Sequence, residues 1–505
     1  MLWLRHPVSR RRLRRYSLVP RVWLCLALLT GCAVGPDFQR PQVQVPANWT
    51  GPIATSATQV TPSAEKGLAR WWTVFEDPTL LSLVERAVQS SLDLKQAEAR
   101  IRQARAARRV AGSGIGPTLD TTGSFRRSRI LGATASGSGG PGAAAGGTEG
   151  VISNHYQGGL DAGWEVDIFG GVRRGIEAAE ADLDATVESR RDVLVTLTAE
   201  VALTYIDLRT FQQRTAIARQ NLKAQEHSAG LTRQRFQVGF VSGLDVANAD
   251  ALVATTAAQI PLLESSTQQS IYSLSVLMGS EPAALIQELS TAAAIPVAPP
   301  SVPVGVPSDL LRRRSDIRRA EAELHAAMAR IGVATADLFP RFTISGSASL
   351  QASDFGSPFN WANRLWSFGP SVSWRVFETG RVLSNIELQK ALQEQNGIAY
   401  QQTILTALQE VENALIASAK EQEHREALVR AVTAYRKAVE LATKLYTEGQ
   451  IDFLNVLDAQ RSLYSSEDAL AQSTRTVSTR LVALYKALGG DWPEDPEEEG
   501  DVLPD

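Results

Sequence analysis

The chain has 505 residues, with 51 basic and 54 acidic side chains and a formal net charge of −3. Two cysteines are too few for a disulfide framework, so disulfides are excluded as the basis of the fold. A nucleic-acid partner is not expected, because phosphate binding needs a basic surface and this chain has more acidic than basic residues.

The N-terminal segment, 1–31, has the layout of a secretion signal. A basic stretch at Arg10–Arg12 precedes an apolar run over Val22–Leu29, and Leu29-Thr30-Gly31-Cys32 follows. That tetrad resembles the lipobox of bacterial lipoproteins, so we expect Cys32 to become the lipid-modified first residue. Cleavage removes seven arginines and no acid, which leaves 44 basic and 54 acidic residues and a net charge of −10. Ala33, in place of aspartate, resembles the signal for export to the outer membrane.

Two halves of the chain repeat each other. Trp164-Glu165-Val166 aligns with Trp374-Arg375-Val376, and the segment from Asp93 aligns with that from Asp316 at a larger offset. The difference between the two offsets lies in a Gly/Ala/Ser-rich stretch, 132–150, which is typical of a surface loop. The repeat predicts two copies of one large element.

Composition and the repeat together set the expected boundaries. A proline-rich arm follows the signal, and a segment with five prolines separates the copies. The C-terminal end is acidic at more than half of its positions, which is typical of a disordered tail. The expected parts are the signal 1–31, the lipidated arm 32–66, the first repeat 67–294, the linker 295–307, the second repeat 308–490 and the tail 491–505.

Each copy contains a helical pattern of unusual length. Helical periodicity begins at Pro78 and runs to about Ser113. After the first pair of strands, 172–238 reads as one uninterrupted helix, and 381–448 reads as its counterpart. Such a helix is roughly 100 Å long, at about 1.5 Å per residue. Each then turns at a glycine-containing loop into a returning helix.

Four segments alternate between apolar and polar residues with the period of a strand. They are expected around 119–126, 160–168, 342–350 and 372–377. A half-buried sheet shows the same alternation. Here one strand carries Asp161, Glu165 and Asp167 on its polar face, which favours a water-filled lumen. No apolar run of about 18 residues follows the signal, so we expect no transmembrane helix.

Membrane-spanning strands would have to close into a barrel, because an open edge cannot face lipid. Four strands are too few, since single-chain barrels begin at eight. The chain is therefore expected to oligomerise. Two copies would give eight strands and three would give twelve, and strand number alone does not choose between them.

Several motifs together resemble one family. Over Cys32 to about Gly490 the chain resembles the outer-membrane factors of tripartite efflux systems, the TolC/OprM-like family, and in particular the lipoprotein branch often labelled NodT. The matching motifs are Cys32-Ala-Val-Gly-Pro-Asp-Phe38, Trp71-Trp72-x-x-Phe75-x-Asp77-Pro78-x-Leu80, Trp164-Glu-Val-Asp-Ile-Phe-Gly170, Arg313-Arg-Ser-Asp-Ile-Arg318-x-Ala320-Glu321 and Leu457-Asp-Ala-Gln-Arg461. Ser315 stands where the family usually has proline, which should affect only a helix start.

The resemblance implies a mostly helical fold with membrane strands, assembled as a homotrimer. Three chains would form a twelve-stranded barrel in outer-membrane lipid, continued by a periplasmic α-helical barrel made of long hairpins. The implied partners are a periplasmic adaptor and an inner-membrane efflux transporter of the RND type, with no cofactor. The chain would pass small toxic compounds or drugs to the outside.

The resemblance also assigns sites. In the family the periplasmic ends of the helices carry a gate, and the matching positions are Leu454 and Asp458, with Leu244, Asp245 and Asn248 in the first copy. Three copies of Asp458 would form a ring that attracts cations. The expected lumen residues are Asp161, Glu165, Asp167 and Arg375. The adaptor is expected to dock at the turns, through Gly239, Gly243, Gly449 and Asp452.

Three other classes of protein fit the sequence less well. An enzyme is not expected, because the five histidines are scattered and no nucleotide-binding, zinc-protease or nucleophile-elbow motif occurs. A helical lipoprotein scaffold is disfavoured by the strands and the signal. The alternative that stays open is the exit duct of a type I protein secretion system, which uses the same fold.

Overall fold

A computed structural model describes residues 33–50, 70–130, 151–297, 307–353 and 360–490. The chain divides into two compact units, and each takes residues from both copies of the repeat. The strand unit comprises residues 1–39, 106–180 and 325–394. The hairpin unit comprises residues 40–105, 181–324 and 395–505.

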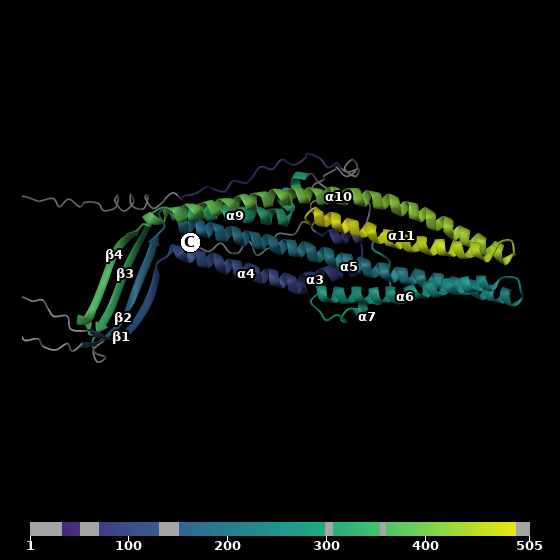
Figure 1. The fold of residues 1–505 in the computed structure, drawn as a ribbon, viewed down its shortest axis with the longest axis horizontal. Helices are drawn as coiled ribbons and strands as arrows, with labels where there is room; N and C mark the ends of the chain where they lie inside the picture. The colour runs from purple at the N-terminus through teal and green to yellow at the C-terminus, as the bar shows by residue number, and fades with distance from the viewer. Residues whose placement is uncertain (1–32, 51–69, 131–150, 298–306, 354–359, 491–505) are drawn as a thin grey trace, which may run out of the picture. The chain divides into compact units, whose positions relative to one another are not determined.

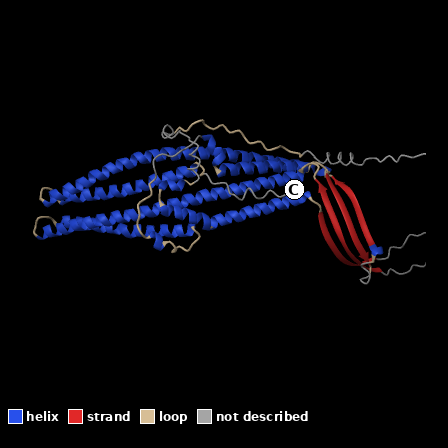
Figure 2. Ribbon diagram, turned by 180° about the vertical axis from the view of Figure 1, so that it is seen from behind, coloured by secondary structure: helices blue, strands red, loops and turns tan. Residues whose placement is uncertain are grey.

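The strand unit contains one antiparallel sheet with its strands in chain order (Figures 1 and 2). Its strands are β1 (Thr118–Ile130), β2 (Val151–Val166), β3 (Arg341–Ala352) and β4 (Arg364–Ser373). The central β2–β3 pair joins the two copies of the repeat. Within the described residues, β1 and β4 each pair on one side only, so the sheet has two open edges.

The position of β4 corrects the expected last strand. Alternation runs on through Val376, but the ladder ends where Arg341 of β3 pairs with Ser373. Pro340 precedes Arg341 and has no N–H with which to extend the pairing. After Ser373 the chain therefore leaves the sheet and enters a short 3₁₀ helix, Val376–Glu378.

The two long helices are confirmed almost to the residue. Helix α5 is Gly171–Gln237 with 67 residues, and α10 is Thr379–Thr447 with 69. Their returning helices are α6 (Gly243–Leu277) and α11 (Phe453–Ala487). The other α-helices of the described residues are α3 (Pro78–Ser90), α4 (Leu92–Gly112), α7 (Ile286–Leu289), α8 (Leu310–Arg313) and α9 (Ser315–Ala336). Ser315 is the first residue of α9, as the sequence predicts.

Local chemistry explains where the first of these helices begins. Asp77 accepts hydrogen bonds from the backbone N–H groups of Thr79 and Leu80, at 2.8 and 3.0 Å. Pro78 occupies the first helical position, where its missing N–H costs nothing. The other carboxylate oxygen of Asp77 accepts from the Tyr205 hydroxyl at 2.9 Å, which ties α3 to α5.

The core of the hairpin unit is built around the tryptophan motif. Trp71 is 1% exposed and stacks on Tyr485 of α11 with ring centroids 5.6 Å apart. Trp72 and Phe75 are buried in the same cluster, which also includes Tyr205 and Ile271. The tryptophan motif, which carries part of the family resemblance, thus has a structural role, because burying large aromatic side chains dominates core energetics.

Helix α6 is, among the described residues, the one helix long and apolar enough to cross a membrane by length and composition. This differs from the expectation that the chain has no transmembrane helix after the signal. The difference arises because the sequence expectation requires an unbroken apolar run, whereas a stretch of sufficient mean hydropathy can include a few polar or charged side chains. Ile271 and Leu274, near the C-terminal end of α6, are fully buried in the core of the hairpin unit, whereas only 17% of the most apolar stretch of the helix is buried.

Several expected segments fall outside the described residues. They are the signal, residues 51–66 of the arm, the glycine-rich loop 132–150, most of the linker 295–307 and the acidic tail 491–505.

Candidate functional sites

The register of the sheet gathers most of the large apolar side chains of all four strands on one face. Directly paired residues of antiparallel strands point to the same side. Leu119 pairs with Ala162, Trp164 pairs with Ile344, and Ile344 pairs with Pro370. The same face continues through Phe125, Tyr156, Leu160, Phe342, Ala348, Trp366, Phe368 and Val372.

This apolar face is uncovered within the described chain. Trp366 and Phe368 are 75% and 74% exposed, and Leu119 is 68% exposed. The hydrophobic core of the hairpin unit includes no strand residue. An antiparallel sheet in a globular protein normally buries its apolar face. A continuous exposed apolar face therefore marks a surface made for a nonaqueous environment or a partner.

The opposite face is polar and carries two of the predicted lumen residues. Asp161 accepts a hydrogen bond from Thr122 at 2.9 Å, and its Cα partner in β1 is Asp120. Glu165 lies on the same face and is 3.9 Å from Arg341. Carboxylates directly opposite each other are tolerated where water screens them. The lumen role of Asp161 and Glu165 stays a prediction.

The strand placement of Asp167 and Arg375 is wrong. Asp167 follows the end of β2, and its carboxylate accepts from the backbone N–H groups of Val172 and Arg173 at the start of α5, at 3.2 and 2.9 Å. Arg375 follows the end of β4 and lies 3.6 Å from Glu378. Alternation could not reveal this, because a helix cap and a strand residue can occupy the same phase of the pattern.

The two tryptophans that define the repeat play the same role in each copy. The Trp164 indole N–H donates to the carbonyl of Ile115 at 2.7 Å, and the Trp374 indole donates to that of Leu338 at 3.0 Å. The two donors are related by the smaller offset of the sequence repeat, and the two acceptors by the larger one. The two copies of the repeat therefore share this hydrogen bond as well as their sequence pattern.

Both hairpin turns end their long helix in the same way. Gly239 and Gly449 have φ of +82° and +76°, a conformation that favours glycine. In each, the glycine N–H donates three residues back and the next N–H donates five residues back, from Phe240 to Arg235 and from Gln450 to Leu445. This is a Schellman-type helix end, and it confirms the turns expected at these glycines.

The predicted gate residues of the second copy share one exposed helix face. Leu454 is 56% exposed and Asp458, four residues on, is exposed as well. The other face of α11 buries Phe453, Val456 and Leu457. Residues four apart in a helix lie one above the other. The geometry thus presents Leu454 and Asp458 together, as a gate would require.

The first copy differs at the matching positions. Leu244 and Asn248 are exposed on α6. Asp245 instead forms a capping box: its carboxylate accepts from the Ser242 N–H at 3.0 Å, and its own N–H donates to the Ser242 hydroxyl at 3.3 Å. Asp245 therefore has a structural role whether or not it also contributes to a gate. Asp452, the matching helix start in the second copy, makes no such side-chain cap.

An apolar tip at the first turn escaped the sequence prediction, which named only the glycines. Phe240 is 81% exposed and Val238 is 66% exposed, on either side of Gly239. A Cβ placed on Gly243 would meet only the ring of Phe236. The sequence does contain an indication of this tip. Val238, Phe240 and Val241 are three apolar residues in a turn, where polar residues are usual.

The residues that follow Cys32 make several contacts with the rest of the strand unit. The Val34 N–H donates to the carbonyl of Phe169 at 3.0 Å. Arg174, whose side chain is 6% exposed, donates to Asp37 at 2.5 Å and to Glu177 at 2.7 Å. Gly35 lies so close to Gly332 that a Cβ on Gly35 would sit 2.5 Å from the Gly332 Cα. Cys32 itself lies outside the described residues.

No group of three or more metal-ligating side chains occurs among the residues that the structure describes. The arrangement is instead that of a polar and an apolar sheet face, combined with long helices that end in exposed turns. The family model of the outer membrane efflux proteins matches residues 83–280 and 306–490, so the chain belongs to that family.

Particular relatives extend the comparison over nearly the whole chain. Nodulation protein T of Rhizobium leguminosarum bv. trifolii is 33% identical over 463 residues, which cover 92% of this chain and 95% of that protein. The probable efflux pump outer membrane protein TtgC of Pseudomonas putida is 33% identical over 475 residues, covering 92% and 94%. Among solved structures, the outer-membrane channel OprN has a TM-score of 0.83 at 37% identity, covering 91% of this chain and all of that one.

Proposed function

We propose that this protein is the exit duct of a tripartite efflux pump. Three copies would form a channel that receives small toxic compounds or drugs from an inner-membrane transporter, of the RND type, through a periplasmic adaptor. The observation that carries the proposal is the continuous exposed apolar face of the sheet, backed by a polar face. That arrangement suits strands between lipid and a water-filled lumen.

The open edges of the sheet support the trimer. Edges of β1 and β4 would be unsatisfied in lipid, so each must pair with another chain. Three chains with four strands each would close a barrel of twelve. The polar faces of all the strands would then line one lumen, and Asp161 and Glu165 would lie in the path of the transported compound.

The relatives favour small-molecule efflux over protein secretion. TtgC carries the description of a probable efflux pump component and matches along almost its full length. The exposed apolar tip around Phe240 supports docking of an adaptor at the hairpin turns, near Gly239, Gly243, Gly449 and Asp452. Transport would be driven by the inner-membrane partner, since this chain carries no nucleotide-binding motif.

Cells that lack the gene provide the test. We expect them to retain more of a fluorescent toxic dye than the parent, and restoring the wild-type gene should reverse the retention. Unchanged dye levels, together with the loss of a secreted protein, would instead support the type I secretion duct.

We also propose that Cys32 carries the lipid anchor. The contacts of Val34, Gly35 and Asp37 would hold the acylated residue close to the end of β2, where the apolar face ends. Metabolic labelling with palmitate should mark the wild-type protein and fail to mark Cys32→Ala. Label retained in Cys32→Ala would refute the anchor without touching the channel proposal.

A further inference from the structure

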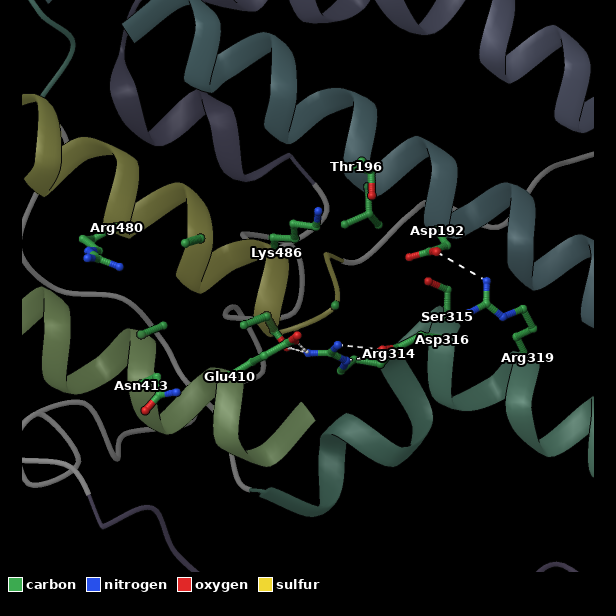
Figure 3. Close-up of a pocket in the computed structure, with 15 residues that line it drawn as sticks. Asp192, Thr196, Arg314, Ser315, Asp316, Arg319, Glu410, Asn413, Arg480 and Lys486 are labelled. Atoms are coloured by element: carbon green, nitrogen blue, oxygen red, sulfur yellow. Dashed lines mark hydrogen bonds and ion pairs between the residues drawn. The ribbon is translucent and has the colours of Figure 1, made fainter. Parts of the chain in front are cut away.

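A polar cavity of about 600 Å³ lies within the hairpin unit, between α5, α9, α10 and α11 (Figure 3). Its charged lining includes four cations, which are Arg314, Arg319, Arg480 and Lys486. It has no part in the sheet faces or hairpin turns described above, and neither the family match nor the channel proposal gives it a role.

Every carboxylate in the lining forms an ion pair with an arginine. Arg314, with a side chain 9% exposed, contacts Asp316 at 2.6 Å and Glu410 at 2.7 Å. Asp192 lies 3.6 Å from Arg319. Three carboxylates and four cations give the lining a formal net charge of +1, and the three carboxylates are engaged by Arg314 and Arg319.

Arg480 and Lys486 are the other two cations of the lining. Both are exposed residues of α11, and neither forms an ion pair or a hydrogen bond within the described part of the chain. Figure 3 shows both on the α11 side of the cavity, across from Asp192 and Arg319. The cavity therefore has one wall with two available positive charges, which fits an anionic occupant.

The chain itself leads from this cavity into an acidic segment. Ala487 and Gly489 line the cavity, and the guanidinium of Arg314 donates to the Ala487 carbonyl at 2.9 Å. Gly489 has φ of +95° and lies so close to Arg314 that a Cβ would meet its backbone at 3.2 Å. The segment 491–505 follows directly, and Asp or Glu occupies more than half of its positions.

We propose that the acidic segment 491–505 is the occupant of this cavity in its own chain, with its carboxylates on Arg480 and Lys486. Four residues past Gly490, Glu494 can reach about 14 Å at roughly 3.5 Å per residue. A short tether gives the segment an effective concentration on the order of millimolar, which favours binding even where single ion pairs are weak. The segment thus acts as a built-in acidic peptide ligand.

The test places a fluorophore on the tail of the full-length chain in detergent, at Glu497→Cys. Wild type treated with the same thiol-reactive fluorophore reports any background from the native cysteines. We expect a fluorescence anisotropy well above that of the free labelled peptide 491–505. The anisotropy should fall to the free-peptide value when Arg480→Gln and Lys486→Gln are combined, and it should fall in high salt because exposed ion pairs are screened.

The matched control combines Lys390→Gln and Arg430→Gln, which remove two exposed cations of α10 that do not line the cavity. This variant should retain the high anisotropy. A labelled tail as mobile in the unsubstituted chain as in free peptide would overturn the proposal. So would equal anisotropy in the Arg480/Lys486 variant and its control.

Mixed preparations separate the chain's own tail from that of a second copy. Copies with a labelled tail but no Arg480 and Lys486 are combined with copies that keep both cations and end at Gly490. A mobile label supports occupancy by the chain's own segment. An immobilised label would show that a second copy supplies the tail, which contradicts the proposal. None of these outcomes depends on whether the protein transports drugs.

Discussion

Asp316 accepts two hydrogen bonds from Arg314, a largely buried arginine of the hairpin unit. Burial alone would raise the pKa of Asp316, but two hydrogen bonds and the charge of Arg314 outweigh burial and lower that pKa below its usual value. A carboxylate with a lowered pKa stabilises the fold above its unfolded pKa of about 3.9 and loses that contribution as pH falls through the lower, folded value.

We therefore expect Asp316→Asn to reduce the free energy of unfolding by about 1–3 kcal/mol at neutral pH. The difference from wild type should shrink as pH falls below about 4. Denaturant unfolding of the detergent-solubilised protein over a pH series measures both. Glu423→Gln, which breaks an exposed pair with Lys420, serves as the control and should change little. Parallel pH profiles for wild type and Asp316→Asn would contradict the prediction.

At the scale of elements, the first hairpin turn tests how much a glycine with positive φ contributes to stability. Gly239 adopts a left-handed conformation with open space around the site of a Cβ, so Gly239→Ala should cost about 1–2 kcal/mol through backbone strain alone. Gly243, four residues away, lacks a positive φ and has its nearest neighbour at 3.7 Å. Gly243→Ala should leave stability nearly unchanged. Thermal unfolding followed by circular dichroism compares the two, and equal melting temperatures would refute the strain argument.

Adjacent residues of β3 test the two faces of the sheet. Ala348 lies on the apolar face and Ser347 on the polar face, hydrogen-bonded to Ser367 at 2.8 Å. An arginine facing lipid near mid-membrane costs about 2–4 kcal/mol, so Ala348→Arg should sharply reduce the folded, membrane-assembled protein. Ser347→Arg should reduce it much less. Heat-modifiable migration on gels measures the folded fraction, and similar losses for both variants would argue against the assignment of faces.

The elements also show what the sequence could and could not reveal. Long helices, their glycine turns and the Asp77 cap were predictable, because each depends on neighbouring residues alone. The ends of β2 and β4 were not, since pairing with β3 decides where a strand stops. For the same reason Asp167 and Arg375 were misplaced. The docking of Val34 and Gly35 against distant Phe169 and Gly332 left no local pattern to detect.

At the scale of the whole assembly, the charge of Asp458 should control which ions pass. Three chains around one axis would bring three copies of this exposed carboxylate to the narrow end of the duct, next to three copies of Leu454. A ring of like charge attracts cations and repels anions. The electrostatic effect of the ring grows with the number of chains that contribute a carboxylate. In a single chain Asp458 is only a solvent-exposed helix residue.

Asp458→Asn removes the charge and keeps the size of the side chain. In planar bilayers with a KCl gradient, we expect the reversal potential to move from the cation-selective side towards zero and the current at matched voltage to rise. Glu440→Gln, which removes an exposed carboxylate paired with Lys437 on α10, should leave both values near wild type. If Asp458→Asn and Glu440→Gln behave alike, the gate lies elsewhere on the hairpins, and Asp458 contributes only to the hydrated surface of α11.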